Sequence, residues 1–377
     1  MAEYKTLVKK IPISPDKKTK QKDYLKKGQL PIVDQGQSLV GGYTDDANMT
    51  VECELPVIVF GDHTRAVKYI TFPFGAGADG IKVLQPKENI LPPFLYYGTQ
   101  YIVAKMPNRG YARHYQYVEK EDLPVPSLPE QERIVARIEE LFSQLDAGVE
   151  TLKKTTAQLS VYRQAAITEA FSVENNTPNV CLSDIAQIIG GITKGRDLSG
   201  TETIELPYLR VANVQNGYLD LSEIKTIKLR VDEKERYLLK PGDVLYTEGG
   251  DRDKLGRGTV WRGEIKDCVH QNHVFKARVD QSKAIPEYVA FWSMSTPARN
   301  YFYQKGKQSV NLASINKTVL SALTLPLPAL EKQREIINHI ESRLSVCDSI
   351  EQTVDTALQQ AEAMRQSILT QAFGGAL

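Results

Sequence analysis

The chain has 377 residues, of which 41% are hydrophobic and 25% charged, and its formal net charge is +1. This length predicts two or three domains of ordinary globular composition, and the small net charge gives no global field that points to nucleic acid. Four scattered cysteines form no CxxC pair, which argues against a disulfide framework and a zinc site. Because no apolar run has membrane-spanning length and no segment resembles a signal peptide, a cytoplasmic location is expected.

The first 128 residues predict a mixed α/β domain. Short β-rich runs occur in LPIVDQGQSLVGGYTDD, ELPVIVFGD and GIKVL, where Gly and Asp separate the apolar stretches. A helix is predicted in LPPFLYYGTQYIVAKM, directly after a proline pair. We therefore expect a first globular domain over residues 1–128.

A long helix is predicted next, over residues 129–175. Apolar residues recur every seven positions, which is typical of a coiled-coil seam. The members of this stripe are Ile138, Leu145, Leu152, Leu159 and Ala166. At 1.5 Å per residue, such a helix would span about 65 Å.

The remainder of the chain repeats this plan. Residues 176–328 predict a second mixed domain, with strands in LPYLRVANV, GDVLYTEGG, GTVWRG and HVFKARV and one helix in IPEYVAFWSMSTPARNYFYQ. Residues 329–377 predict a second long helix with the same heptad spacing. Its seam consists of Ile340, Cys347, Val354, Ala361 and Ile368. Neither helix can bury its seam alone, so antiparallel packing of the two is expected.

The two helices are copies of one another, because matched residues lie 202 positions apart without a gap. Leu128, Gln131, Ile134, Ile138, Glu139, Ser143 and Asp146 match Leu330, Gln333, Ile336, Ile340, Glu341, Ser345 and Asp348. Further along, RQAAITEAF matches RQSILTQAF at the same offset. A period this long indicates a duplicated domain-plus-helix unit with pseudo-two-fold symmetry.

Enzymatic motifs are weak in this sequence. The segment LPPF places Leu91 where an amino-methyltransferase needs a polar acceptor, and no glycine-rich cofactor loop opens a βαβ unit. Asp243, Glu264 and Lys266 fit a metal-dependent nuclease motif only loosely. His270 and His273 lack nearby metal-ligand partners, so no metal site is expected. The chain is interpreted as a binder, not a catalyst.

Basic and polar loops recur at matching places in both domains, which suits DNA. Lysines supply phosphate contacts, whereas Arg, Asn and Gln can read base edges. The candidates in the first domain are His63, Thr64, Arg65, Lys68, Arg109, Arg113 and His114, beside the lysine-dense segment VKKIPISPDKKTKQKDYLKKGQ. The candidates in the second domain are Lys194, Arg196, Arg252, Lys254, Arg257, Gln271, Asn272, His273, Lys305, Lys307, Gln308 and Asn311.

The segments LPVPSLPEQERIVARIEEL and LPLPALEKQREIINHIESRL, with the endings ITEAF and ILTQAFGGAL, resemble the specificity subunit of type I restriction–modification systems. LSDIAQIIGG resembles the opening of a target-recognition domain, which the first globule lacks in clear form. The resemblance implies two α/β target-recognition domains joined by two long antiparallel coiled-coil helices.

The resemblance also implies a function and partners. Each recognition domain would read one half of a split, asymmetric double-stranded DNA sequence, and the helices would fix the distance between the halves. The helices would dock two methyltransferase subunits, which bind S-adenosylmethionine and flip adenine, and a restriction subunit could join them. The chain itself would need no cofactor. Candidate partner contacts are Glu130, Gln131, Arg133, Lys332, Gln333 and Arg334. The chief alternative is a coiled-coil protein–protein scaffold without DNA specificity.

Overall fold

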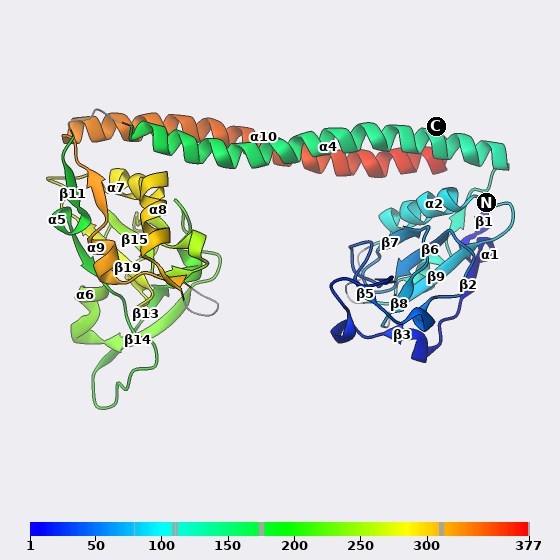
Figure 1. Cartoon of the computed structure of the whole chain (residues 1–377), viewed down its shortest axis with the longest axis horizontal. Helices are drawn as coiled ribbons and strands as arrows, with labels where there is room; N and C mark the ends of the chain where they lie inside the picture. The colour runs from blue at the N-terminus through cyan, green and yellow to red at the C-terminus, as the bar shows by residue number, and fades with distance from the viewer. Residues whose placement is uncertain (79, 108–109, 111, 173–176, 309–312, 376–377) are drawn as a thin grey trace. The chain divides into compact units, whose positions relative to one another are not determined.

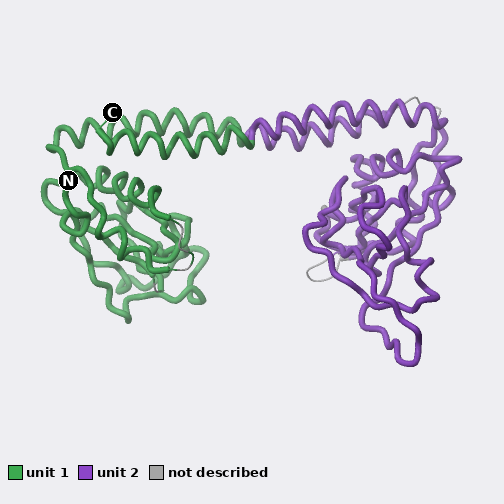
Figure 2. The backbone as a smooth tube through the Cα atoms, turned by 180° about the vertical axis from the view of Figure 1, so that it is seen from behind, with its two compact units in different colours: residues 1–153, 355–377 green, residues 154–354 purple. Residues whose placement is uncertain are grey.

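The computed structural model of the chain describes residues 1–377 except 79, 108–109, 111, 173–176, 309–312 and 376–377 (Figure 1). The backbone forms two compact units, Met1–Lys153 with Asp355–Leu377, and Lys154–Val354 (Figure 2). Each unit contains one mixed α/β globule and a pair of helical segments, one from each of two long helices. The end of the chain therefore completes the first unit.

The first globule is built on a four-stranded antiparallel sheet, in the order β2-β9-β6-β7. These strands are β2 (Val8–Ile11), β9 (Ile81–Pro86), β6 (Val57–Gly61) and β7 (Val67–Ile70). A second sheet has the order β3-β8-β4-β5, with β3 (Lys18–Thr19), β8 (Gly75–Gly77), β4 (Leu30–Val33) and β5 (Gly42–Thr44). A short pair joins β1 (Ala2–Glu3) to β10 (Asp122–Leu123). The strands predicted in this region are confirmed.

The second globule repeats the main sheet in the same antiparallel order, β12-β19-β15-β17. These strands are β12 (Ala186–Ile189), β19 (Val274–Val279), β15 (Asp243–Thr247) and β17 (Gly258–Val260). Two smaller sheets contain β14 (Lys225–Arg230), β13 (Thr203–Leu209) and β18 (Val269–His270), and then β16 (Gly249–Gly250), β21 (Ala313–Ser314) and β20 (Lys307–Gln308). A short pair joins β11 (Asn179–Cys181) to β22 (Thr324–Pro326).

Short helices accompany the sheets in both globules. The first globule contains α1 (Tyr4–Leu7), α2 (Pro92–Lys105) and α3 (Tyr115–Val118). The second contains α5 (Leu182–Ile185), α6 (Lys234–Tyr237), α7 (Pro286–Met294), α8 (Thr296–Lys305) and α9 (Lys317–Ser321). Helices α2 and α7 both begin with a proline, whose missing N–H would have no partner in the first turn. The duplicated sheet order and helix starts show the internal duplication.

The prediction of one continuous helix over residues 285–304 was wrong. The structure has two helices there, α7 and α8, and Ser295 between them has an extended backbone (ψ 155°). Pro297 lies in the first turn of α8. Pro297 cannot donate a backbone hydrogen bond to the carbonyl four residues earlier, and its ring would clash with that carbonyl, so α7 cannot continue through it and ends at Met294.

The two predicted long helices are present as α4 (Leu128–Ala170) and α10 (Leu330–Gly374). Their predicted seam residues are buried or half-buried along both helices. No helix among the described residues is both long and apolar enough to cross a membrane.

Ion pairs show that α4 and α10 run antiparallel in each unit. In the second unit, Arg163 lies 2.6 Å from the carboxylate of Asp348, and Arg343 lies 2.6 Å from that of Glu169. In the first unit, Arg365 pairs with Asp146, and its guanidinium lies 4.4 Å from the centre of the Phe142 ring. Residue numbers that increase along α4 therefore pair with residue numbers that decrease along α10. Arg163 and Arg365, like Asp348 and Asp146, are matched residues of the sequence repeat.

Each globule packs onto its own pair of helical segments through apolar side chains. In the first unit, Phe373 of α10 lies 5.1 Å from Phe94 and 5.3 Å from Tyr101, measured between ring centres. In the second unit, Phe171 lies 5.2 Å from the rings of both Tyr288 and Trp292. Phe171 and Phe373 are matched residues of the repeat, so both globules are held to the helices in the same way.

Candidate nucleic-acid interface

The candidates of the first globule gather in and after the turn between β6 and β7. Arg65 has a left-handed backbone (φ 60°), and its N–H donates to the Gly61 carbonyl (2.8 Å). The Thr64 hydroxyl donates to the Gln35 carbonyl oxygen. A ring nitrogen of His63 lies 3.2 Å from the Ala112 carbonyl oxygen, which connects this turn to the segment that carries exposed Arg113. These contacts make a fixed polar turn from which Thr64 reaches solvent.

Lys68 and His114 were wrong predictions, because both side chains are buried. Lys68 is 4% exposed, and its ammonium donates to the Asp34 carbonyl oxygen (2.8 Å). Burial lowers the pKa of Lys68, although the nearby Asp34 carboxylate opposes that shift. His114 is 1% exposed, and its Nδ1 lies 3.0 Å from the Asp62 carbonyl oxygen. Both residues stabilise the fold below the turn and cannot reach DNA from these positions.

In the second globule, three of the predicted basic residues lie in the η6 turn (Arg252–Lys254) and directly before β17. Arg252 donates to the Tyr303 carbonyl oxygen (3.2 Å) and lies 4.3 Å from the centre of the Tyr303 ring. Lys254 pairs with Asp251. Arg257 Nη1 donates to Gln215 Oε1 at 3.0 Å.

The loop between β18 and β19 brings three further candidates together. The backbone N–H of Gln271 donates to the Leu209 carbonyl (2.9 Å), and the Asn272 N–H donates to the Ile192 carbonyl (2.9 Å). The His273 ring Nδ1 lies 2.7 Å from a carboxylate oxygen of Glu248, with His273 itself exposed. The backbone of this loop is therefore fixed while its polar side chains stay at or near the surface.

The remaining candidates of this globule are dispersed. Arg196 forms a two-pronged ion pair with Glu233, with both N–O distances at 2.9 Å, so its guanidinium is engaged within the fold. Lys194, Lys305 and Lys307 are exposed. Arg109, Asn311 and the side chain of Gln308 lie outside the described residues.

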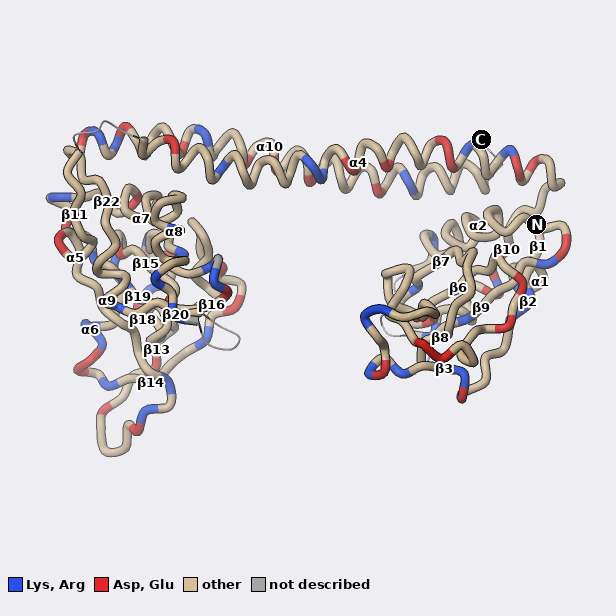
Figure 3. The backbone as a smooth tube through the Cα atoms, viewed as in Figure 1, with Lys and Arg blue, Asp and Glu red and all other residues tan. Residues whose placement is uncertain are grey.

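Charge of both signs follows the loops of each globule (Figure 3). Several candidate cations are matched by a neighbouring carboxylate, as in Lys254 with Asp251 and Arg196 with Glu233. The loops therefore form polar surfaces of mixed charge. Which basic side chains are paired within the fold depends on their local contacts and not on the net charge of the loop.

The six predicted partner contacts divide into two groups. Glu130 and Arg133 pair with each other on the surface of α4 (2.7 Å), Lys332 pairs with Glu335 on α10 (2.8 Å), and Arg334 is exposed. In contrast, Gln131 and Gln333 are both 0% exposed. Their prediction as partner contacts was wrong, because each side chain is used up in hydrogen bonds to its own globule.

The nuclease alternative does not fit the structure. Asp243 is 1% exposed, and its carboxylate accepts hydrogen bonds from Arg278 (2.8 and 2.7 Å) and from the Lys240 backbone N–H (2.8 Å). The Glu264 carboxylate instead accepts from the Arg262 N–H. Among the described residues, no group of three His, Cys, Asp or Glu side chains could hold a metal ion. Asp243 is a structural ion-pair partner.

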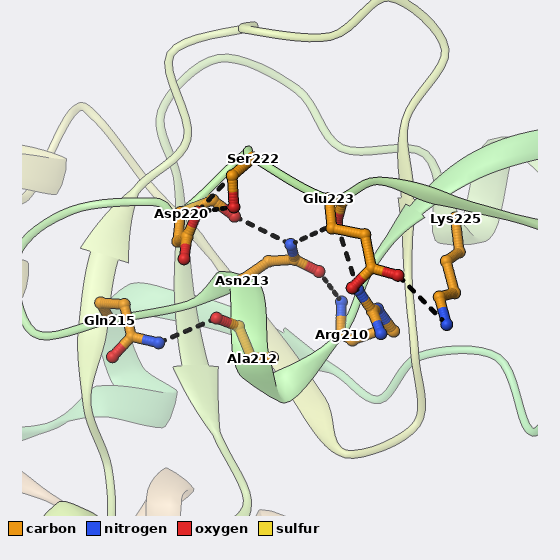
Figure 4. Close-up of polar contacts among 8 residues, drawn as sticks. All are labelled: Arg210, Ala212, Asn213, Gln215, Asp220, Ser222, Glu223 and Lys225. Atoms are coloured by element: carbon orange, nitrogen blue, oxygen red, sulfur yellow. Dashed lines mark hydrogen bonds and ion pairs between the residues drawn. The ribbon is translucent and has the colours of Figure 1, made fainter. Parts of the chain in front are cut away.

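Sequence reasoning missed a loop that supports Arg257. This loop runs from Arg210 to Lys225 and is organised around Asn213, whose side chain is 3% exposed (Figure 4). The surrounding sequence VANVQNGYLD contains an Asn-Gly pair, which is typical of a turn but carries no signal of a buried polar centre.

The comparisons with known proteins identify the family. The family described as "Type I restriction modification DNA specificity domain" matches residues 10–159 and 174–360, and the chain belongs to it. The StySPI specificity subunit of a type I restriction enzyme from Salmonella potsdam is 27% identical over 274 residues, which cover 68% of this chain and 58% of that protein. The EcoBI specificity subunit of Escherichia coli is 26% identical over 375 residues, covering 90% and 74% respectively.

The chain spans 58% of the length of the Salmonella potsdam protein, which is less than two thirds. A solved chain described under "Structural basis underlying complex assembly and conformational transition of the type I R-M system" has a TM-score of 0.67 and 17% identity. That match covers 100% of this chain and 97% of the other, and it supports the fold.

Proposed function

We propose that the chain is the DNA-recognition subunit of a type I restriction–modification complex, and that each globule reads one half of a bipartite, asymmetric sequence. The main support for this proposal is a comparison of the two globules. The two globules share the order of the main sheet and the same attachment to the long helices, but they present different polar residues at their loops. A shared framework with different loops suits two heads that read different half-sites.

Contacts of two kinds are proposed for these loops. Arg65, Arg257, Gln271 and Asn272 are restrained by hydrogen bonds or by fixed backbone, which suits the reading of base edges. Exposed Lys194, Lys305 and Lys307, together with Arg113, suit phosphate contacts, which add affinity without sequence choice. His63, Thr64, Arg252, Lys254 and His273 remain proposed contributors.

The long helices are proposed to bind the partner subunits. Their duplication offers two matched surfaces, which suits two copies of one methyltransferase subunit, with a restriction subunit as a further partner. Arg133, Lys332 and Arg334 are exposed and Glu130 is half-buried at the two helix starts, and these four residues are the proposed contacts. The chain would take no catalytic part, and S-adenosylmethionine would be bound by the methyltransferase, in the cytoplasm.

The salt dependence of DNA binding tests this proposal against the protein–protein scaffold alternative. The affinity of the chain, with its co-purified partner, for a long duplex of mixed sequence would be measured from about 50 to about 200 mM salt. Contact with about six phosphates predicts a fall of roughly a thousandfold over this range. Binding that is absent, or that is unaffected by salt, would favour the scaffold.

A further inference from the structure

The loop 210–225 of the second globule has a buried polar centre, Asn213, that determines its shape (Figure 4). Asn213 Oδ1 accepts from the Arg210 backbone N–H (2.9 Å), and Nδ2 donates to the carbonyl oxygens of Asp220 (2.8 Å) and Glu223 (3.0 Å). The Asp220 N–H donates back to the Asn213 carbonyl (2.8 Å). One amide side chain thus satisfies three backbone groups and closes the loop on itself.

The same loop is attached to the strand that follows Arg257. The Gly217 N–H donates to the Gly258 carbonyl at the start of β17 (3.1 Å), and the Thr247 N–H of β15 donates to the Arg257 carbonyl (3.0 Å). Gly256 has a positive φ of 65°, and a Cβ there would lie 2.3 Å from the Phe302 ring. The backbone around Arg257 is therefore held from both sides and cannot shift easily.

Gln215 connects this loop to the Arg257 side chain. Its Nε2 donates to the Ala212 carbonyl oxygen (2.8 Å), and its Oε1 accepts from Arg257 Nη1 (3.0 Å). The two contacts fix the orientation of the amide, because only the oxygen can accept from a guanidinium. No other hydrogen bond is made by the Arg257 guanidinium within the part of the chain that the structure describes. Its remaining N–H groups are available to a ligand.

A guanidinium that donates one hydrogen bond within the protein, and whose other N–H groups have no partner there, is oriented in advance for a ligand. Arginine reads guanine by donating two parallel hydrogen bonds to O6 and N7, and this fork must lie in one plane with the base. An unrestrained arginine has to order its long side chain when it binds, which costs conformational entropy. Holding Nη1 in advance removes part of that cost and favours one direction of approach.

From these contacts we infer that Gln215 is a specificity-determining positioning residue of the second recognition domain, which orients Arg257 to read a guanine. This inference rests on the proposed function and adds to it a residue and a base. Asn213 supports Gln215 indirectly, because it fixes the backbone of the loop that carries Gln215. Gln215 acts through Arg257 and is not assigned a base contact of its own.

The test is a selection from a randomised duplex library, performed with the chain and its co-purified partner and followed by sequencing. Arg257→Ala is expected to reduce the preference for guanine at one position of the second half-site by roughly tenfold. Gln215→Ala and Gln215→Met are both expected to relax that same position, with all other positions unchanged. Gln187→Ala is the matched control, because Gln187 is an exposed glutamine on β12 of the same globule.

Two further readouts separate positioning from loss of structure. The double variant Gln215→Ala with Arg257→Ala should be no more relaxed than Arg257→Ala alone, because the two residues act as a unit. Gln215→Glu keeps an acceptor toward Arg257, so it should retain the guanine preference while lowering affinity for all duplexes. The unfolding midpoint of Gln215→Met should stay close to that of the control, because Gln215 is only half-buried and methionine fills a similar volume.

Several outcomes would overturn the inference. A Gln215→Met chain that selects the same bases as the parent, or relaxes a position different from that of Arg257→Ala, would do so. An Arg257→Ala chain with an unchanged consensus would remove both residues from base reading. Failure of the proposed function is distinguishable, because the parent chain itself would then enrich no sequence.

Discussion

Gln131 and Gln333 occupy matched places in the two halves of the chain and make the same three hydrogen bonds. Gln131 Oε1 accepts from the Leu91 N–H (2.9 Å), and Nε2 donates to the Asn89 (3.0 Å) and Pro126 (2.9 Å) carbonyls. Gln333 makes the equivalent bonds to Ile285 (2.8 Å), Lys283 (3.1 Å) and Pro328 (2.8 Å). Each glutamine joins the start of a long helix to the start of a globular helix.

Replacing either glutamine with leucine should destabilise its own unit. The change fills a similar volume but leaves a backbone N–H and two half-buried or exposed carbonyls without their side-chain partner, which predicts a loss of about 1–3 kcal/mol. Denaturant unfolding followed by circular dichroism measures the effect. The control is Glu132→Ala, since Glu132 is an exposed neighbour on α4. If Gln131→Leu behaved like this control, the joining role would be disproved.

Phe373 should hold the end of α10 onto the first globule. Phe373→Ala removes a side chain that is 5% exposed and packs on Phe94 and Tyr101, so a loss of about 3–5 kcal/mol is expected. Hydrogen exchange should quicken in the last turns of α10 and in α2. Met364→Ala serves as the control, because Met364 is 56% exposed on the same helix. Equal exchange in both variants would show that this contact does not anchor the helix.

The buried histidine of β18 should make the second unit less stable in mild acid. Burial lowers the pKa of His270 to about 4 from 6.5, so the unfolded chain takes up a proton in a range where the folded chain does not. The free energy of unfolding should therefore fall as the pH decreases from about 6.5 to about 4. Above this range, the ring is neutral in both states and adds no pH dependence.

The variant His270→Asn tests this effect. It keeps a side-chain donor toward the Val274 carbonyl oxygen, which lies 2.6 Å from His270 Nδ1, and it removes the titrating ring. Between pH 7 and pH 5, its unfolding midpoint should decline less steeply than that of the parent chain. Parallel declines would assign the acid sensitivity to other groups.

The helices should set the distance between the two half-sites if the proposed function holds. Inserting one heptad after Lys153 in α4 and one after Val354 in α10 keeps the seam in register and adds about 10 Å, roughly three base pairs. The preferred gap between half-sites should lengthen accordingly. Insertion into α4 alone should instead disrupt helix pairing and lower stability. An unchanged gap in the double insertion would refute the role of the helices as a spacer.

The framework of the molecule could be predicted from the sequence because it is encoded by repeated local patterns. The heptad seam from Ile138 to Ala166, the proline pair at the start of α2 and the ungapped match between the two helix starts each depend on a few neighbouring residues. The internal repeat added the antiparallel pairing, since neither seam could remain exposed. These features appear in α4, α2 and α10 as expected.

Burial of polar side chains could not be predicted in the same way. Lys68 is covered because Asp34, far away in sequence, supplies an acceptor, and Gln131 is covered because the loop before α2 folds back onto it. Both contacts depend on tertiary packing, which no local pattern specifies. One feature of the sequence did point to the burial of Gln131 and Gln333. Both copies of the duplicated motif have glutamine at this place, and an identical residue in both copies suits a shared structural role as well as a partner contact. Asn213 had no such signal.

Sequencing of the duplexes selected by the parent chain with its co-purified partner tests the central claim most directly. Two recognition domains on a shared framework predict two short fixed blocks of different sequence, separated by a gap of constant length and no preferred sequence. A single continuous block, or no enrichment beyond the starting library, would contradict the two-headed account of this chain.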